Sequence, residues 1–283
     1  MSSTARHCAR DPRALVLVRY QTMSWATFTL ERRNDNPMLR FWRDLFCALG
    51  VLIVTADCAA NTGAGLTAQQ AFSDPRVVAL VEAVSRSDYA SADKALKAGA
   101  NVNAVGSDGI SPLLWMLGAA PQVKPVEYLL KAGANPNYRD ERHKASAMYI
   151  AAGGEHTNKL LALLLRYKGD PNMLGPRDVP LLFTAVQQQR DDNIKLLVGS
   201  GADVNWTDRH KDTAANQAID YARFDLIVYF LDHGLTSNLQ DLASEVEIRV
   251  VPNSDAQRQK EKVIEMLKAR GVKFPAFVRH KVE

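Results

Sequence analysis

Histidine, serine and cysteine are the side chains of this chain best suited to catalysis, and their spacing argues against an active site. The sequence holds no Gly-x-Ser-x-Gly, no glycine-rich phosphate loop ending in Lys-Ser or Lys-Thr, and no His-Glu-x-x-His. We therefore expect no enzymatic activity, no cofactor and no metal. Four histidines, His143, His156, His210 and His233, are expected to lie on the surface.

The three cysteines, Cys8, Cys47 and Cys58, all lie within the first 60 residues. Removal of that leading region would leave a chain without a thiol, which excludes disulfides and thiolate metal sites from the remainder. A chain without thiols is compatible with an oxidising compartment, although it does not by itself place the protein there.

Aromatic and cationic side chains suited to binding another protein cluster in polar stretches. Tyr138–His143 and Trp206–Asp212 each begin with an aromatic residue and continue with mixed charges, and Met173–Asp178 carries Arg177 beside two apolar residues. Tyrosine, tryptophan and arginine dominate binding hot spots because they offer large contact area and directional hydrogen bonds. The alternative is that these stretches are polar only because water surrounds them, with Trp206 packed under its own turn. The candidate contact residues are Tyr138, Arg139, Arg142, His143, Arg177, Trp206, Arg209, His210 and Lys211.

The segments that position these residues recur at a fixed period. Tyr128–Tyr138 has an apolar helix end, then Gly133 for the left-handed position beyond a helix, then Asn137, which is able to turn the chain and bond its own backbone. Successive copies are spaced by 34, 35, 33 and 33 residues, which predicts an array of one structural unit. The closing asparagines of the copies are Asn103, Asn137, Asn172, Asn205 and Asn238.

A second motif recurs in phase with the first. In its best copy, Ser111 is able to cap a helix that begins at Pro112, where the missing N–H costs nothing. Thr213 is able to cap in the same way, whereas Val179 is not. The four copies begin at Gly109, Lys144, Arg177 and Lys211.

Together the two motifs resemble the ankyrin repeat, whose copies carry Gly-x-Thr-Pro-Leu-His near the start and Leu-Leu-x-x-Gly-Ala-Asp-x-Asn at the end. The resemblance covers roughly residues 74 to 272 and implies an all-α solenoid, in which each unit is a turn followed by two antiparallel helices. Only the first and third copies keep the proline. No copy keeps the histidine, which leaves open how neighbouring repeats are hydrogen-bonded; its place is taken by Leu114, Tyr149, Leu182 and Asn216.

The period also predicts the domain boundaries. Residues 74–276 are expected to form the array. An N-terminal cap at 74–105 begins with Asp74 and Pro75, and a C-terminal cap at 239–276 presents its charged residues to solvent. A linker at 61–73 precedes the array, and a tail at 277–283 follows it. The four full repeats are predicted at 106–139, 140–173, 174–207 and 208–238.

The net charge of +4 does not indicate a nucleic-acid partner. Residues 1–60 hold eight arginines and five acids, so residues 61–283 carry 27 basic and 26 acidic groups and are nearly neutral. Basic residues are not interleaved with aromatic ones, as nucleic-acid binding would favour.

Residues 38–60 are typical of a secretory signal peptide. A short basic start at Met38 leads into the apolar run Leu45–Ala56, which is too short to span a bilayer comfortably, and small residues follow. Cleavage is expected after Ala60. A lipoprotein would instead be acylated at Cys58, although Asp57 does not fit the small residue expected before it. A buried helix or an uncleaved anchor is the remaining alternative.

Residues 1–37 contain six arginines and no periodic pattern. We expect them to be disordered, or to be a gene-model extension upstream of a true start at Met38. The rival interpretation is a cytoplasmic tail.

The resemblance implies a monomer that binds another protein through its turn tips and the exposed side of its inner helices, which adds Tyr221 to the candidate contacts. With a signal peptide, this favours a bacterial periplasmic binding module that touches the membrane only through its signal or a lipid anchor. An immunity-type inhibitor of a toxic effector is our leading hypothesis. The alternatives are an envelope stress-protection scaffold, an accessory to a periplasmic enzyme, or an effector delivered to a host.

Overall fold

The computed structural model describes residues 66–119, 121–251 and 253–276, and within them the chain is all-α. These residues contain thirteen α-helices, two short 3₁₀ turns (Ser107–Gly109 and Pro176–Asp178) and, as their only β pairings, two isolated bridges. The all-α solenoid that the resemblance implied is confirmed. The predicted signal peptide at 38–60 with Cys58, the upstream residues 1–37 and the tail 277–283 lie outside the described residues.

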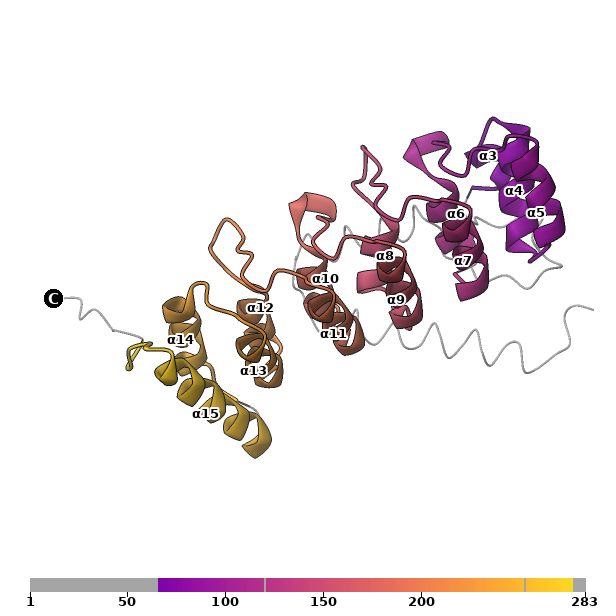
Figure 1. Ribbon diagram of the computed structural model, residues 1–283. Helices are drawn as coiled ribbons and strands as arrows, with labels where there is room; N and C mark the ends of the chain where they lie inside the picture. The colour runs from indigo at the N-terminus through magenta and orange to yellow at the C-terminus, as the bar shows by residue number, and fades with distance from the viewer. Residues whose placement is uncertain (1–65, 120, 252, 277–283) are drawn as a thin grey trace, which may run out of the picture. The chain divides into compact units, whose positions relative to one another are not determined.

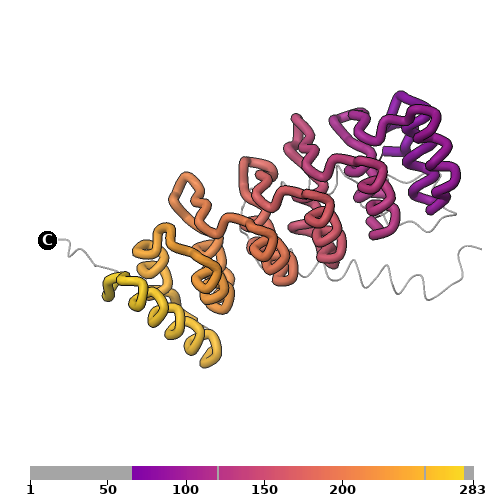
Figure 2. Tube along the Cα trace, in the orientation of Figure 1, coloured from indigo at the N-terminus to yellow at the C-terminus, as the bar shows by residue number. Residues whose placement is uncertain are grey.

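The helices from α4 onward form antiparallel pairs that line up in chain order (Figure 1). The loops before α6, α8, α10 and α12 project from one side of this row, as the chain trace in Figure 2 shows. Each inner helix packs against the next: α4 (Pro75–Ser85), α6 (Pro112–Ala119), α8 (Ala147–Gly153), α10 (Leu181–Gln187), α12 (Ala214–Asp220) and α14 (Leu239–Ile248). The outer helices are α5 (Tyr89–Lys97), α7 (Val123–Lys131), α9 (Asn158–Arg166), α11 (Asp191–Gly199), α13 (Phe224–Asp232) and α15 (Ser254–Ala269).

Residues 66–73, which the sequence assigned to a linker, instead belong to the array. They contain the short helix α3, Ala68–Ala71, whose two alanines and Phe72 are buried in one cluster with α4. The indole Nε1 of Trp115 on α6 donates to the Leu66 carbonyl at 2.9 Å. The segment orders because the first helix pair has no preceding repeat, and α3 covers apolar surface that would otherwise meet water.

Short polar side chains fix where the inner helices begin. Ser111 accepts a hydrogen bond from the Leu114 N–H at 3.2 Å ahead of α6, as its sequence predicted, and Asp74 does the same for α4. Pro125 lies in the first turn of α7 (Val123–Lys131), where backbone N–H groups lack intrahelical partners in any case.

The apolar run predicted to be buried in the second repeat forms the core of α9. Four of its leucines are at most 5% exposed, and they are Leu160, Leu161, Leu163 and Leu164. Fully burying one leucine side chain is worth about 1.5–3 kcal/mol. Because such a helix has no polar face wide enough to stand alone, its stability depends on the neighbouring pairs.

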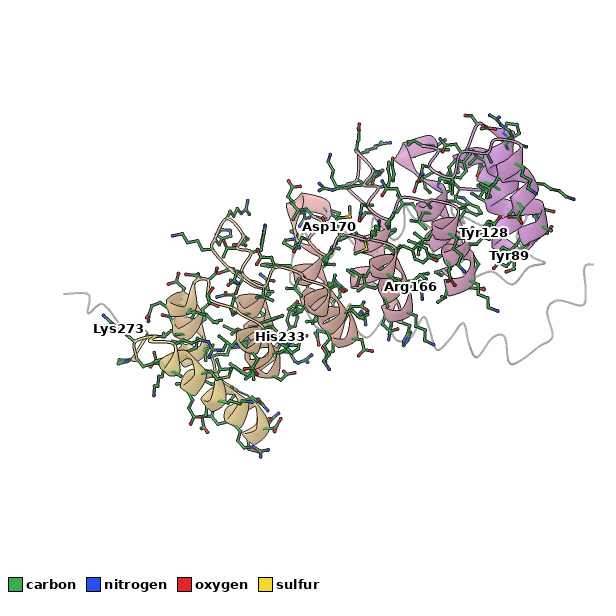
Figure 3. The ribbon with its side chains drawn as sticks, viewed as in Figure 1. Tyr89, Tyr128, Arg166, Asp170, His233 and Lys273 are labelled. Carbon is green, nitrogen blue, oxygen red and sulfur yellow. The ribbon has the colours of Figure 1, made fainter. Side chains whose placement is uncertain are left out.

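Polar contacts join the outer helices of neighbouring pairs (Figure 3). The rings of Tyr89 on α5 and Tyr128 on α7 stack with centroids 4.9 Å apart, and the Tyr128 hydroxyl donates to Asp93 at 2.5 Å. Farther along, Arg166 on α9 donates to Glu127 on α7 at 3.0 Å. These contacts help to hold the outer helices in register.

The C-terminal cap differs from the four repeats at its start. Helix α14 begins directly after Asn238, so the cap lacks the projecting hairpin that precedes each earlier inner helix. Ile248 is 58% exposed, because no further repeat covers that end of α14. Helix α15 closes the stack, burying Val263 and Leu267, and ends before Gly271 at φ +83° as predicted.

Candidate functional site

An asparagine ladder holds the hairpins in register. The first four closing asparagines each donate from Nδ2 to the carbonyl that follows the next outer helix, and their Oδ1 accepts from a backbone N–H two residues beyond that carbonyl. For Asn137, Nδ2 lies 2.9 Å from the Lys168 carbonyl oxygen and Oδ1 lies 2.7 Å from the N–H of Asp170, which Figure 3 labels. The equivalent bonds of Asn103, Asn172 and Asn205 are 2.7–3.0 Å long.

The ladder answers the question left open by the missing histidine. The sequence predicted that Asn137 would bond its own backbone, but the residue two places before it does so, since Asn135 Oδ1 accepts the Asn137 N–H at 2.9 Å. The Asn137 side chain is thereby left to reach the next repeat. Each bond contributes about 0.5–1.5 kcal/mol, and together they fix the spacing of adjacent hairpins.

Two acids of the hairpins, Asp140 and Asp208, turn toward the backbone and hold the turns. Asp140 is 3% exposed, and its carboxylate accepts from the backbone N–H groups of Arg142, His143 and Ala145 at 3.0, 2.6 and 2.7 Å. In the fourth repeat, Asp208 Oδ1 similarly accepts from two backbone N–H groups. These carboxylates satisfy backbone donors that the turns leave unpaired.

The cations of the same hairpins lie outside. Arg142 and His143 are exposed in the second hairpin, although Arg142 pairs with Asp108 of the preceding one, and the fourth hairpin exposes Arg209, His210 and Lys211. Asp108, Glu141 and Asp178 are also exposed, but burial of Asp140 and partial burial of Asp208 leave the hairpins with more exposed cations than exposed acids. We name this row of tips the hairpin edge; its exposed cationic members are Arg142, Lys144, Arg177, Arg209 and Lys211.

The second motif places a left-handed residue at the same point of all four hairpins. In the first repeat this residue is Gly109, at φ +76°. The same backbone hydrogen bond closes each hairpin, and it puts Lys144, Asp178 and Lys211 at this point of the next three repeats, with φ of +57°, +57° and +69°. The third copy is therefore shifted by one residue from the motif in the sequence, and Arg177, the residue before Asp178, is itself left-handed at φ +61°. A side chain in this conformation costs about 1–2 kcal/mol that glycine avoids. Alignment of the four copies could have identified Lys144, which the sequence analysis did not select.

Two predicted contact residues tie neighbouring hairpins together. The Tyr138 hydroxyl donates to the Gly109 carbonyl at 2.8 Å, and burial raises the pKa of that hydroxyl. Arg139 Nη2 donates to the Gly175 carbonyl at 2.7 Å and to Asp178 at 2.9 Å. Both side chains therefore have a structural role within the stack and offer less free polar surface than their sequence indicated.

The two remaining aromatic candidates lie nearer the inner helices. Trp206 is half-buried, and its ring meets Phe183 of α10 edge-on with centroids 5.1 Å apart, so it packs against the inner helix of its own repeat rather than beneath its own turn alone. Tyr221 follows α12 and is 39% exposed, and burial of its hydroxyl raises the tyrosine pKa. Of the two, Tyr221 offers more surface to a partner.

A groove that the sequence analysis did not anticipate lies between α12 and α14. Its volume is about 650 Å³, and Figure 1 shows the two helices as neighbours at the C-terminal end of the row. We call it the α12–α14 groove. It is lined by Asp212, Asn216, Gln217, Ile219, Asp220, Glu245, Ile248, Arg249 and Val250.

Carboxylates dominate the electrostatics of this groove. Burial raises the pKa of Glu245, the Asn216 side chain lowers it through a hydrogen bond, and the charges of Asp212, Asp220 and Asp241 raise it further. Burial likewise raises the pKa of Asp212, and the nearby Asp208 adds to the shift. These shifts report carboxylates that are partly desolvated and repel one another.

Other kinds of site find little support in the described residues. There, no group of three or more histidine, cysteine or acidic side chains is placed to hold a metal ion, and no helix is long and apolar enough to cross a membrane. The four histidines predicted to lie on the surface are all exposed. The hairpin edge and the α12–α14 groove are the two surfaces of the described residues that are best suited to binding another molecule.

Comparison with known proteins gives two partial matches, and no family model matches the chain. Over 87 residues the chain is 37% identical to the nuclear factor NF-kappa-B p105 subunit of Gallus gallus, which is 30% of this chain and 9% of that protein. Over 75 residues it is 31% identical to putative ankyrin repeat protein R664 of Acanthamoeba polyphaga mimivirus, which is 26% of this chain and 46% of that protein. The chain thus spans less than half the length of either relative. With the period, the phased motifs and the paired helices, these matches support an ankyrin-repeat fold for the chain.

Proposed function

We propose that this chain is a non-catalytic protein-binding module whose hairpin edge docks an acidic surface of its partner. The observation that carries the proposal is the row of exposed cations on the hairpins, of which Lys144 and Lys211 take the left-handed position that Gly109 holds in the first repeat. Glycine would fit that backbone with less strain, as Gly109 does in the first repeat. Strain that persists at one repeated position is typical of functional surfaces.

The rest of the hairpin supports the same role. Buried Asp140 and the ladder asparagines hold the backbone of the turns, so the outward cations are presented in a fixed row. A preorganised surface loses little conformational entropy on binding, which improves affinity for a given contact area. The exposed arginines add the bidentate geometry that suits carboxylates.

We further propose that the module acts in the bacterial periplasm as an immunity-type inhibitor that occludes a toxic effector. This part rests on the sequence of residues 38–60, which is typical of a secretory signal, and on the family's general use as a binding scaffold. A stress-protection scaffold or an enzyme accessory would use the same surface. The inhibitor is favoured because a rigid edge is suited to blocking one partner.

A capture experiment with matched variants tests the binding role. The full chain and a K144G/R177G/K211G variant serve as baits for the envelope fraction of the source cell. A K124Q/K159Q/K195Q variant removes the same charge from exposed positions on the outer helices. We expect the wild type and the outer-helix variant to recover the same protein, and the edge variant to lose it while its Tm is unchanged or higher. Equal recovery by all three would overturn the role of the edge.

Mass spectrometry of the mature N-terminus tests the compartment. A chain that begins at Asn61 supports export with cleavage, and an acylated Cys58 supports a lipoprotein. An intact Met1 in the cytoplasmic fraction would overturn the periplasmic proposal while leaving the binding role standing.

A further inference from the structure

The α12–α14 groove exists because the C-terminal cap lacks a hairpin. Repeats one to four each insert a hairpin between the closing asparagine and the inner helix, whereas α14 starts at the residue after Asn238. The Asn238 side chain turns back instead and donates to the Lys211 carbonyl at 2.8 Å. The groove extends along α12 from Asp212 at its start to Asp220 at its end.

Three carboxylates line this groove without a matching cation. In the part of the chain that the structure describes, no lysine or arginine forms an ion pair with Asp212, Asp220 or Glu245. Arg249, the one cation among the lining residues, donates through Nη2 to the backbone carbonyl of Asp220 at 2.7 Å. The charge of His210 partly offsets the rise in the pKa of Asp212. The Asn216 side-chain amide donates a hydrogen bond to the Glu245 carboxylate at 3.2 Å. The negative charge is therefore largely uncompensated.

The rim of the groove is apolar and exposed. Ile248 is 58% and Val250 87% exposed, and Ile219 lies buried beside them. A unit that only ends the stack needs a polar outer face. Exposed branched aliphatic side chains beside half-buried carboxylates do not serve that role. Aliphatic contact beside unpaired charge is instead the arrangement that binds a cationic side chain by both its stem and its head.

We propose that the α12–α14 groove binds a basic, aliphatic segment of the protein partner. A lysine or arginine of that segment lies among Asp212, Asp220 and Glu245, and a neighbouring aliphatic residue packs on Ile248 and Val250. This assignment rests on the proposed binding function and names the chemistry of its second contact. The volume of about 650 Å³ lies within the range of roughly 300–1,000 Å³ typical of ligand pockets.

Charge complementarity selects this occupant. An acidic segment would add repulsion to a groove where Asp212 and Asp220 already raise the pKa of Glu245, and an apolar segment would bury these carboxylates without a counter-charge. Together with the hairpin edge, the groove gives the stack two contacts of opposite sign. Such a pattern fixes the orientation of a partner and rejects partners with a single sign of charge.

A titration with defined peptides tests the groove apart from the hairpin edge. The probe is a fluorescein-labelled Leu-Lys-Leu-Lys-Leu-Lys peptide, measured by anisotropy at low salt against the full chain. The controls are peptides in which glutamate replaces lysine or serine replaces leucine. We expect saturable binding of the first peptide, at least tenfold weaker binding of the serine peptide, and no binding of the glutamate peptide.

Matched variants locate the binding. D212N/D220N/E245Q keeps the shapes of the side chains and removes the charge, and E155Q/D232N/E265Q removes the same charge from exposed positions elsewhere. The groove variant should weaken binding of the basic peptide at least tenfold and the control variant less than twofold. A basic peptide that fails to bind, or that binds both variants equally, would overturn the proposal.

Two other occupants are separated by the same assay. A chain ended after Ala276 that binds the peptide at least tenfold tighter than the full chain would identify residues 277–283 as the occupant and overturn the assignment to a partner. A wild-type dimer that the groove variant dissociates would do the same in favour of a second copy. Loss of capture by the edge variant remains a separate readout, so the groove proposal is able to fail while the binding module stands.

Discussion

The hairpin edge and the α12–α14 groove are built from similar residues, yet they expose opposite charges. In the second hairpin, the Asp140 carboxylate accepts hydrogen bonds from three backbone N–H groups and is buried. The exposed side chains of that hairpin are therefore mainly cationic. The cap has no hairpin whose backbone N–H groups could bind an acid, and the Glu245 carboxylate lines the groove. The sign of each surface is thus set by which charges the backbone needs.

The largest effect that would break this comparison is expected from the buried acid of the second hairpin. Asp140→Ala should lower the free energy of unfolding by about 3 kcal/mol, because it leaves three buried or half-buried N–H groups without an acceptor. Asp178→Ala is the matched control; it removes only an exposed ion pair with Arg139 and should cost less than about 1 kcal/mol. Urea unfolding measures both, and equal losses would contradict an inward structural role for the acid.

The ladder gives the next largest difference between repeats and cap. Asn172→Gly should cost about 2 kcal/mol, since it removes the bonds to the Gly201 carbonyl and to the Asp203 N–H. Asn238→Gly removes one bond and places glycine at φ +54°, where it relieves strain, so the net loss should be below about 1 kcal/mol. Thermal unfolding of the two variants side by side tests the order, and a larger loss at Asn238 would refute it.

The left-handed position should respond in the opposite direction. Lys211→Gly is expected to raise the free energy of unfolding by about 0.5–1 kcal/mol, because glycine adopts φ +69° without a Cβ penalty that exceeds its own entropic cost. Lys195→Gly, in the middle of α11, should instead destabilise the chain by about 1 kcal/mol. If Lys211→Gly also destabilised, the strain attributed to the hairpin edge would be disproved.

The smallest effect is the pH dependence of the groove. The pKa of Glu245 is raised in the folded chain, so folding binds the proton more tightly, and this group stabilises the fold at low pH and loses that contribution as pH rises through its folded pKa. Glu245→Gln should therefore raise Tm at pH 7 and have little effect near pH 4. The gain should stay below about 1 kcal/mol because the carboxylate is only partly buried and water screens its charge. Glu155→Gln, fully outside the groove, should shift Tm equally little at both pH values, and calorimetry at pH 4 and pH 7 decides between these outcomes.

Local patterns predicted most of the fold because each copy encodes its own boundaries. Ser111 and Asp74 cap helices where their sequence placed them, and Gly133 lies at φ +94° beyond α7. The segment at 66–73 was misassigned because its short alanine-rich sequence has no strong signal of its own. It folds as α3 only where α4 and Trp115 offer apolar surface to cover.

The candidate site was less predictable because a charged residue's type does not say which way it points. Arg139 and Tyr138 looked like partner contacts, but they meet carbonyl groups of hairpins that are 29–36 residues away in sequence. Lys144 looked like an ordinary loop residue until its φ aligned it with Gly109. Glu245 and Asp212 lie 33 positions apart, and nothing in either segment alone announces that they share a groove.

The sequence by itself determined the period, the helix pairs and the glycines that separate them, because these depend on propensities and spacings within a single repeat. Only the tertiary structure decided that Asn137 bonds the next repeat, that Asp140 turns inward and that the carboxylates along α12 and α14 stay uncompensated. Those outcomes depend on which backbone groups of a neighbouring repeat need a partner. The sequence of one repeat does not show which of these groups need a partner, because neighbouring repeats meet only when the copies stack.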